Sequence, residues 1–220
     1  MTIEPFVWLI ALLPVAAYLT LFGAIRLSNR PMVTTGGRDT FAVAIAISGC
    51  FMVGPAELFF PSEAGALFGP MIWPVLMLLY LLLVILVILS SRPKLIVYGL
   101  GPTLLTEPLL LAAKTIDPTA ICDADAGQIQ LPASGIHLRI DGHRGTESAE
   151  VTAYESVASP RFWRQLLRAL RAEIASEGAS SPGSGVIVFA IGIVMVAYVL
   201  FIVYFRHNEI VQGFREWLWR

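Results

Sequence analysis

Four long apolar stretches constrain this chain more than any other feature of its sequence. They cover residues 6–25, 41–60, 72–89 and 186–205. Each has close to the 20 or so residues that an α-helix needs to cross a hydrocarbon layer roughly 30 Å thick. The chain is 56% hydrophobic and only 14% charged, whereas an ordinary soluble domain is about 25% charged. The sequence therefore predicts a membrane protein with four transmembrane helices.

We expect the first apolar stretch to stay in the chain as a span. Its leader contains Glu4 and neither Lys nor Arg. The apolar run is also longer than the core of a signal peptide, and no convincing small-residue cleavage site precedes Arg26. Three spans therefore fall within residues 1–91, and the fourth follows a polar segment.

The positions of Lys and Arg in the short connecting segments predict the direction of the spans, because cytoplasmic loops are enriched in both. They gather after the first and third spans, as Arg26, Arg30 and Arg38 and as Arg92 and Lys94. Residues 61–70, between the second and third spans, contain none. The pattern predicts an outside N-terminus and a cytoplasmic segment 93–181 in a bacterial-type inner (plasma) membrane. The three arginines of the tail 206–220 disagree with this pattern.

The sequence pattern of residues 93–181 is typical of a folded soluble domain. Short β-type runs separated by turn residues alternate with two helical patterns. The expected strands are 95–99, 120–123, 128–131, 136–140 and 149–154, and the expected helices are 104–116 and 160–176. The order β-α-β-β-β-β-α predicts a small α+β domain with its helices on one face of a mostly antiparallel sheet.

Local signals support both predicted helices and the return to the membrane. Glu107-Pro108 is interpreted as a helical start, because Pro is tolerated in the first turn. Ser159 is expected to be the N-cap of the second helix, with Pro160 at its first position. Residues 178–185, rich in Ser and Gly, predict a flexible tether to the fourth span. In outline the chain is similar to bacterial membrane proteins with a small cytosolic insertion, a resemblance that implies no chemistry.

Motifs for bound phosphate or calcium are incomplete. Residues 98–102 read Tyr-Gly-Leu-Gly-Pro, where the third Gly of a dinucleotide loop is missing and Pro102 removes an N–H that a phosphate would use. Residues 123–127 have the spacing of a calcium loop, but Gly127, Gln128 and Ser134 stand where an EF-hand needs an oxygen ligand, Gly and Glu. We interpret both segments as turns and expect no bound cofactor.

The remaining reactive groups are sparse. His137, Asp141 and His143 form a His-carboxylate cluster, but along an extended strand the two histidines lie about 20 Å apart, too far for zinc ligands. We interpret the cluster as a solvated strand face and expect no metal site. Cys50 and Cys122 are expected to be free, buried and inert. The sequence predicts no catalytic residue and leaves enzymatic activity uncertain, with the balance against it.

Two features are candidates for a functional role at the membrane. Glu57 is the one acidic residue inside a predicted span, and such carboxylates often mark ion or proton paths. The alternative is that Glu57 has no functional role and lies at the membrane interface, after the helix break at Gly54-Pro55.

Two predicted helices are amphipathic, with basic residues beside an apolar face. Arg161, Arg164, Arg168 and Arg171 form a stripe on the helix 160–176, and we name them as candidate contacts for lipid headgroups. The alternative is that they are solvated while the apolar face packs on the sheet. The tail 206–220 places Ile210, Val211, Phe214, Trp217 and Leu218 on one face beside Arg215 and Arg220. This pattern predicts an interfacial amphipathic tail, with a partner-binding helix as the competing interpretation.

Three functions remain open on this sequence. The leading hypothesis is a non-catalytic assembly, regulatory or scaffold element that presents its cytosolic α+β domain to a membrane or cytosolic protein partner. The alternative is a transport component or accessory subunit of a membrane complex, since Pro14, Pro74 and Gly54-Pro55 could break helices around a site. A membrane enzyme is the third. A net charge of −1 gives no basic excess, so no nucleic-acid partner is expected.

Overall fold

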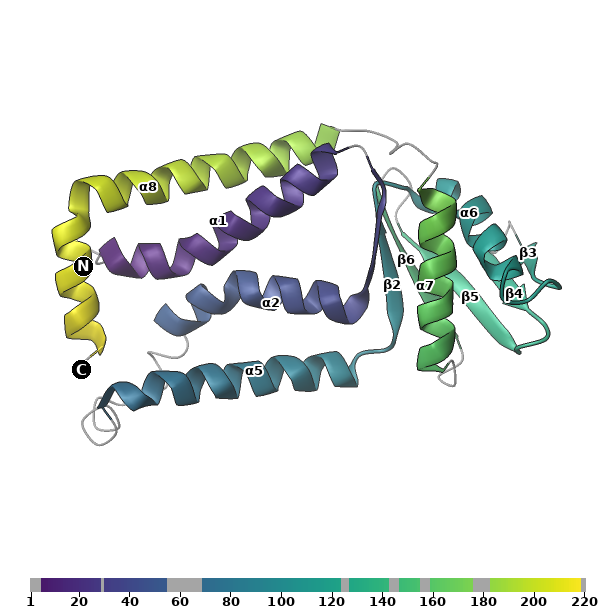
Figure 1. The fold of residues 1–220 in the computed structure, drawn as a ribbon, viewed down its shortest axis with the longest axis horizontal. Helices are drawn as coiled ribbons and strands as arrows, with labels where there is room; N and C mark the ends of the chain where they lie inside the picture. Colours follow the sequence, from purple (N-terminus) through teal and green to yellow (C-terminus); the bar gives the residue numbers. More distant parts are fainter. Residues whose placement is uncertain are drawn as a thin grey trace. The chain divides into compact units, whose positions relative to one another are not determined.

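The computed structural model describes residues 5–28, 30–54, 69–123, 127–142, 147–154, 159–175 and 183–218 (Figure 1). The chain divides into two compact units. The helical unit comprises Met1–Ala24, Phe41–Ile88 and Ile187–Arg220, and the α+β unit comprises Ile25–Thr40 and Leu89–Val186. We describe each unit by itself.

Within the described residues, the helical unit contains four long helices. They are α1 (Pro5–Leu27), α2 (Gly36–Val53), α5 (Ile72–Ser90, after a 3-10 turn at Gly69–Met71) and α8 (Gly183–Leu218). All four are long and apolar enough to cross a membrane by length and composition. The prediction of four apolar helices is therefore confirmed.

The boundaries of α2 differ from the prediction. The second apolar helix was expected over residues 41–60, but it begins at Gly36, directly after a strand that ends at Thr35. Its polar first turn carries Asp39, which suits the positive end of the helix dipole. Hydropathy alone misses such a start, because the first turn is not apolar. The end at residue 60 is untested, since residues 55–68, including Glu57, lie outside the described residues.

Glycines bring the helices of this unit into close contact. A Cβ added to Gly192 of α8 would stand 2.7 Å from the backbone nitrogen of Thr20 in α1. One added to Gly23 of α1 would stand 2.6 Å from the backbone of Phe189 in α8. Small residues at such crossings allow backbones to approach where no hydrophobic effect drives association, as in a bilayer. Between α5 and α2, the hydroxyl of Tyr80 donates to the carbonyl of Ala44 at 2.6 Å.

The C-terminal tail continues α8 instead of forming a separate helix. Arg206 has non-helical angles (φ −127°, ψ 26°) that kink the helix, and helical structure resumes to Leu218 (Figure 1). Trp217 is 5% exposed, and its ring stacks on Trp73 with centroids 3.7 Å apart. Val211 and Phe214 are exposed, so the residues of the predicted face whose burial is described do not share one environment. An interfacial position of the tail stays a prediction.

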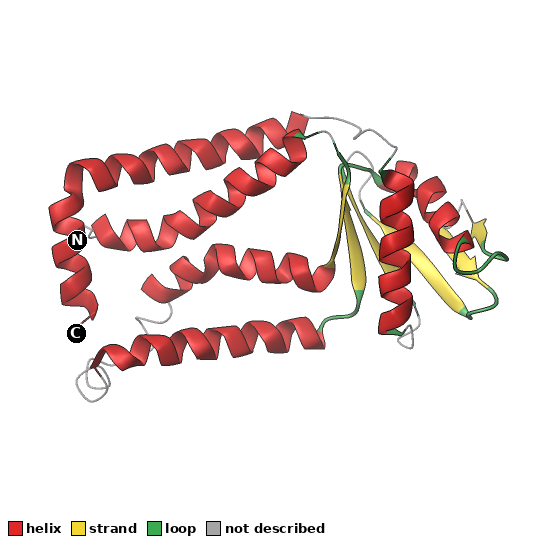
Figure 2. Ribbon diagram, in the orientation of Figure 1, coloured by secondary structure: helices red, strands yellow, loops and turns green. Residues whose placement is uncertain are grey.

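A six-stranded antiparallel sheet forms the α+β unit (Figure 2). Its spatial order is β1-β2-β6-β5-β4-β3. The strands are β1 (Met32–Thr35), β2 (Lys94–Tyr98), β3 (Ile121–Asp123), β4 (Gln128–Leu131), β5 (Ile136–Asp141) and β6 (Ser148–Ala153). Five of them match the predicted strands within one or two residues.

Strand β1 was not predicted. It comes from the segment between α1 and α2, and it pairs with β2 in the register Val33↔Val97. Four residues are too few for a recognisable period-2 pattern. The sheet therefore joins two segments that are far apart in sequence, and it extends beyond the predicted domain 93–181.

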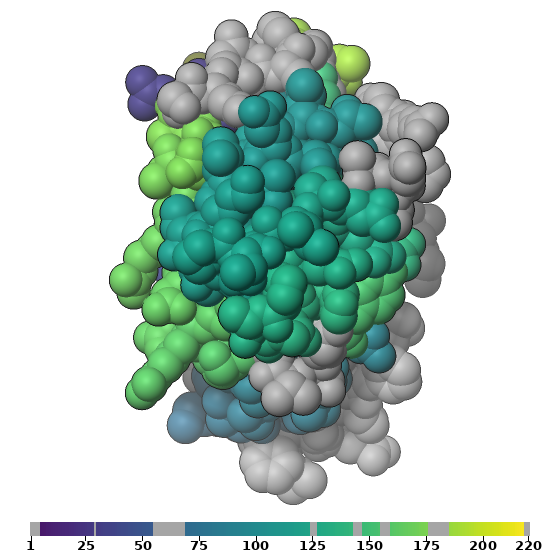
Figure 3. Space-filling model, turned by 90° about the vertical axis from the view of Figure 1, so that its right-hand side faces the viewer, coloured from purple at the N-terminus to yellow at the C-terminus, as the bar shows by residue number. Residues whose placement is uncertain are grey.

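Two helices, α6 (Pro102–Lys114) and α7 (Pro160–Ile174), complete the unit. In Figure 3, α6 and its neighbouring strands (teal) cover the middle of the visible face, with α7 (green) along one side. Side chains of both helices and of one sheet face form a single apolar core. Its fully buried members include Leu95, Val97, Leu105, Leu109, Ile129, Leu131, Leu138, Val151, Leu166 and Leu170. This arrangement agrees with helices on one face of an antiparallel sheet.

The two helix starts had different outcomes. The N-cap at Ser159 is confirmed, since its hydroxyl accepts from the Phe162 N–H at 3.2 Å and Pro160 begins α7. The start at Glu107-Pro108 was wrong, because α6 begins at Pro102 and Pro108 lies inside it. Gly99, with φ +89°, turns the chain after β2, and Pro102 occupies the first helical turn, where its missing N–H costs nothing.

A buried carboxylate fixes the turn after α6. Asp117 is 1% exposed and accepts hydrogen bonds from the Thr119 hydroxyl (2.6 Å), the Thr119 N–H (3.0 Å) and the Ala133 N–H (2.9 Å). The bond from the Thr119 hydroxyl is the largest cause that lowers the pKa of Asp117, and it and the backbone bonds outweigh the opposing effect of burial. Asp117 therefore ties the turn after α6 to the turn between β4 and β5.

We predict that Gly192→Leu destabilises the α1–α8 contact. The new side chain has no room beside Thr20, and overpacking typically costs about 1–3 kcal/mol. Thermal unfolding of the full chain in detergent measures the effect. Ala197→Leu is the matched control, because Ala197 is an exposed residue of the same helix. Equal melting temperatures for the two variants would contradict the close crossing.

We also predict a pH-dependent effect of Asp117→Asn. A carboxyl with a lowered folded-state pKa contributes stability above its unfolded pKa, and this contribution is lost as the pH falls through the folded pKa. The variant should be less stable than the natural chain at neutral pH, and the gap should narrow in acid. Urea unfolding of the full chain across this pH range checks the prediction. Glu209→Gln, an exposed carboxylate, should show no such convergence.

Candidate functional site

Helix α7 separates its apolar and basic residues as expected. Phe162, Trp163, Leu166, Leu167, Leu170 and Ile174 are buried in the core, so the apolar face packs within the unit. Arg161, Arg164 and Arg168 are exposed. These three arginines are therefore available to solvent or to an anionic surface, and their contact with lipid stays a prediction.

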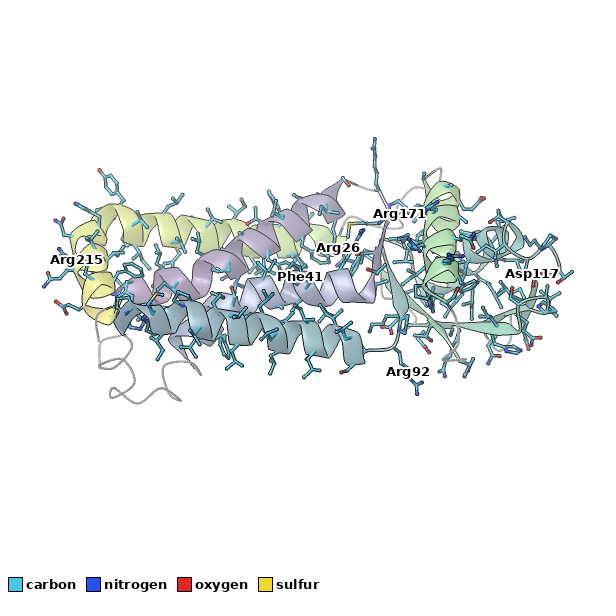
Figure 4. All side chains as sticks on the ribbon, turned by 60° about the horizontal axis from the view of Figure 1, so that its bottom comes forward. Arg26, Phe41, Arg92, Asp117, Arg171 and Arg215 are labelled. Carbon is cyan, nitrogen blue, oxygen red and sulfur yellow. The ribbon has the colours of Figure 1, made fainter. Side chains whose placement is uncertain are left out.

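Arg171, the fourth arginine of the stripe, is also exposed, but it makes a contact with the sheet. Its Nε and Nη2 atoms both donate to the carbonyl oxygen of Val33 in β1, at 3.3 and 2.9 Å (Figure 4). Because β1 is an edge strand, its outward carbonyls lack a strand partner, and Arg171 satisfies one of them. The contact fixes both the end of α7 and the orientation of the guanidinium.

A hollow of about 590 Å³ opens beside this contact. Arg30 and Arg171 line it together with Met32, Val33 and Ile174. Arg30 lies in the short segment between α1 and β1. The fold therefore brings two cations that are 141 positions apart in sequence to one hollow with apolar walls.

The sheet face opposite the helices is polar and forms a second hollow of about 480 Å³. Lys94 forms an ion pair with Glu150 at 3.0 Å, and the Tyr98 hydroxyl donates to Asp39 at 2.8 Å. The same hollow includes Asp141. Its carboxylates outnumber its single lysine, so this open face favours cationic or hydrogen-bond-donating groups.

Charge pairing on the open face follows from the strand register. Asp141 and Glu150 are directly opposite each other on β5 and β6, and like charges so placed destabilise a sheet. Each has a basic partner: Lys94 pairs with Glu150, and Arg139 pairs with Asp141 at 2.6 Å. The Asp141 carboxylate is the largest cause that raises the pKa of Arg139. The network offsets part of the negative charge of the face.

The His-carboxylate cluster named from sequence is only partly within the described residues. His137 and Asp141 both lie in β5, but His143 falls in the gap 143–146. Asp141 contacts Arg139 and the Thr152 hydroxyl. Within the described ranges, no group of three or more His, Cys, Asp or Glu side chains is placed to hold a metal ion.

Both cysteines are free thiols. Cys122 is half-buried, and burial followed by the negative charge of Asp123 raises its pKa, which lowers its thiolate fraction. Cys50 was expected to be buried, but it is exposed, and its thiol donates to the Ala11 carbonyl at 3.5 Å. The predicted burial of Cys50 was therefore wrong.

An ion pair near the end of α1 was also missed by the sequence analysis. Arg26 contacts Glu147 at 3.1 Å, and the two side chains are only 16% and 19% exposed (Figure 4). From sequence, Arg26 counted only as a loop cation that orients the spans. The signal for its partner is weak, because Glu147 lies 121 positions away.

Known proteins do not add to this description. The sequence matches no protein-family model, and no curated protein and no solved structure is significantly similar to it. The site is therefore defined by its geometry alone: a polar open sheet face on one side of the α+β unit and a two-arginine hollow at its β1 edge.

Proposed function

We propose that this chain is a multi-pass membrane protein that presents a cytosolic α+β domain to a protein partner. It acts as a non-catalytic assembly or regulatory scaffold in a bacterial-type inner membrane. The proposal rests on the position of strand β1 in the chain. This strand belongs to the sheet of the folded domain and connects it directly to the first two apolar helices, α1 and α2.

The surface of the helical unit supports a membrane location. Large apolar side chains are exposed along its helices, with Leu21 at 66%, Leu86 at 62% and Val194 at 67%. Soluble proteins rarely expose continuous apolar surfaces of this kind. In a lipid bilayer the same side chains have an apolar surrounding, and the helical backbone satisfies its own hydrogen bonds.

The sheet supports a common location for the two basic segments. Strand β1 lies between α1 and α2, and β2 follows α5. Because these strands are paired, the two segments share one side of any membrane that the helices cross. Both contain the Arg and Lys residues that favour the cytoplasm, so we assign the α+β unit to the cytoplasm and the N-terminus to the outside.

The connections between strands and helices suit a scaffold that responds to its partner. Thr35 ends β1 and Gly36 begins α2, with no residue between them. Ser90 ends α5, and β2 begins at Lys94 after three residues. A partner that bound the open face next to β2 would therefore act on strands joined to the apolar helices by very short links.

A transport component or accessory subunit is the second candidate. Pro14 lies inside α1, where it removes one intrahelical hydrogen bond. Transporters place their sites at such interrupted helices. In that case the partner would contact the apolar helices and not the α+β unit.

We predict that a photo-crosslinker at Tyr154 captures one discrete protein partner in native membranes. Tyr154 is 51% exposed, and its hydroxyl lies with Gln128 and Arg139 on the open face. The adduct should be lost in the Lys94→Glu variant, which turns an ion pair into a repulsion. It should return in the Lys94→Glu/Glu150→Lys swap, which restores the pair.

Probes at two other positions separate the candidates. Leu79 is exposed on α5 and Leu104 on α6. An adduct from Leu79 but not from Tyr154 would favour the membrane-complex subunit. Absence of a discrete adduct at all three positions, judged by mass after denaturing electrophoresis, would reject the scaffold.

A further inference from the structure

The hollow at the β1 edge has cationic walls and an apolar floor. Arg30 and Arg171 are the charged side chains among its described lining residues, and Met32, Val33 and Ile174 are apolar. Its volume of about 590 Å³ is within the usual range of small-molecule sites. No carboxylate is among the described residues that line it.

The guanidinium of Arg171 is held in place without losing its charge. Two of its nitrogens donate to the Val33 carbonyl, which is neutral. A guanidinium has five N–H donors, so donors remain after this contact. Among the described residues, the ion pairs join other arginines and lysines to carboxylates and include neither Arg30 nor Arg171.

We propose that Arg30 and Arg171 form a specific anion site that binds a phosphate group, supplied by an anionic phospholipid. The planar donor fork of arginine matches phosphate oxygens. The prior ordering of Arg171 by Val33 reduces the entropy lost when the anion binds. The two cations come from different elements, so the site exists only in the folded unit.

A lipid source is favoured by the apolar floor and by the chain connection. Val33 and Ile174 are each only 2% exposed, so the accessible apolar surface of the hollow comes from the half-buried Pro31 and Met32. A free phosphate would leave this surface uncovered, whereas the glycerol and acyl portion of a lipid would contact it. Arg30 follows Leu27, the last residue of α1, by three residues, which span at most about 11 Å. This part of the inference rests on the membrane location proposed above.

The second hollow and the other arginines of α7, all within the described residues, do not offer the same chemistry. The hollow on the open face contains Asp39, Asp141 and Glu150 against one lysine, so it disfavours anions. Arg161 and Arg168 are exposed on α7, and Arg164 bonds only within its helix, to the Pro160 carbonyl at 3.3 Å. Arg30 and Arg171 are exposed as well, but they differ in lining one hollow together and in the anchoring of Arg171 by the Val33 carbonyl.

The first test measures lipid binding to the full chain in a neutral detergent by native mass spectrometry. Phosphatidylglycerol is the probe, and zwitterionic phosphatidylcholine is the comparison. Arg30→Gln and Arg171→Gln should each weaken phosphatidylglycerol binding about five-fold, and the double variant about 25-fold, which is the effect expected of about one Arg contact each. Lys114→Gln is the matched control and should leave binding unchanged, because Lys114 is an exposed cation of α6 that belongs neither to the arginine stripe nor to the hollow.

The second test replaces the lipid by inorganic phosphate and follows the melting temperature of the full chain. If the Arg30 and Arg171 variants weaken both ligands, the phosphate group is what the site recognises. If they weaken only the lipid, the site requires the phosphodiester together with its apolar part. The lipid assignment would be overturned if the two variants weakened the binding of inorganic phosphate but left the binding of phosphatidylglycerol unchanged.

Two results would overturn the anion site itself. One is phosphatidylglycerol and phosphate binding that neither Arg30→Gln nor Arg171→Gln changes. The other is an equal loss in Lys114→Gln, which would indicate diffuse attraction by any surface cation. Arg30→Gln leaves the Val33 contact of Arg171 intact, so it remains informative if Arg171→Gln fails to fold.

The membrane proposal can fail separately. If the purified chain were monodisperse in buffer without detergent, the membrane location would be wrong. The phosphate titration of the natural chain and of Arg30→Gln would still decide whether the two arginines form an anion site.

Discussion

The backbone pairing of β1 with β2 is the interaction on which the rest of the architecture depends. Without β1, the segment between α1 and α2 would be a loop, and the α+β unit would connect to the apolar helices only through α5 and α8. The pairing makes that segment part of the sheet, with Val33 in the same core as Val97. Two separate parts of the chain must therefore meet before the core is complete.

This requirement separates what the sequence could predict from what it could not. The four apolar helices and five of the strands follow from local composition and periodicity, and so does the Ser159 cap. Strand β1 gains its stability from β2, whose paired residues lie between 60 positions (Thr35↔Leu95) and 66 positions (Met32↔Tyr98) later in the sequence. The start of α6 was misplaced because both Pro102 and Pro108 could occupy the first turn of a helix. In the structure the chain turns at Gly99, and the helix begins at Pro102.

The candidate sites show the same division. The arginine stripe of α7 and the burial of its apolar face follow from helical spacing. The Arg171–Val33 contact does not, because it requires β1, and Arg30 was weighed only as a charge that orients the spans. Asp117 was likewise missed, although Asp-Pro-Thr followed by a strand is compatible with a side chain that accepts from the N–H two residues later. Pairwise contacts over long sequence separations leave little trace in a single sequence.

The edges of the sheet determine how this unit can meet another chain. At one end, Arg171 occupies the Val33 carbonyl of β1. At the other end, β3 is only three residues long. Natural sheets use such blocked or shortened borders to resist growth by strand addition. For the partner proposed above, these borders favour contact through side-chain surfaces, which select by shape and charge, over main-chain hydrogen bonds that any extended peptide can offer.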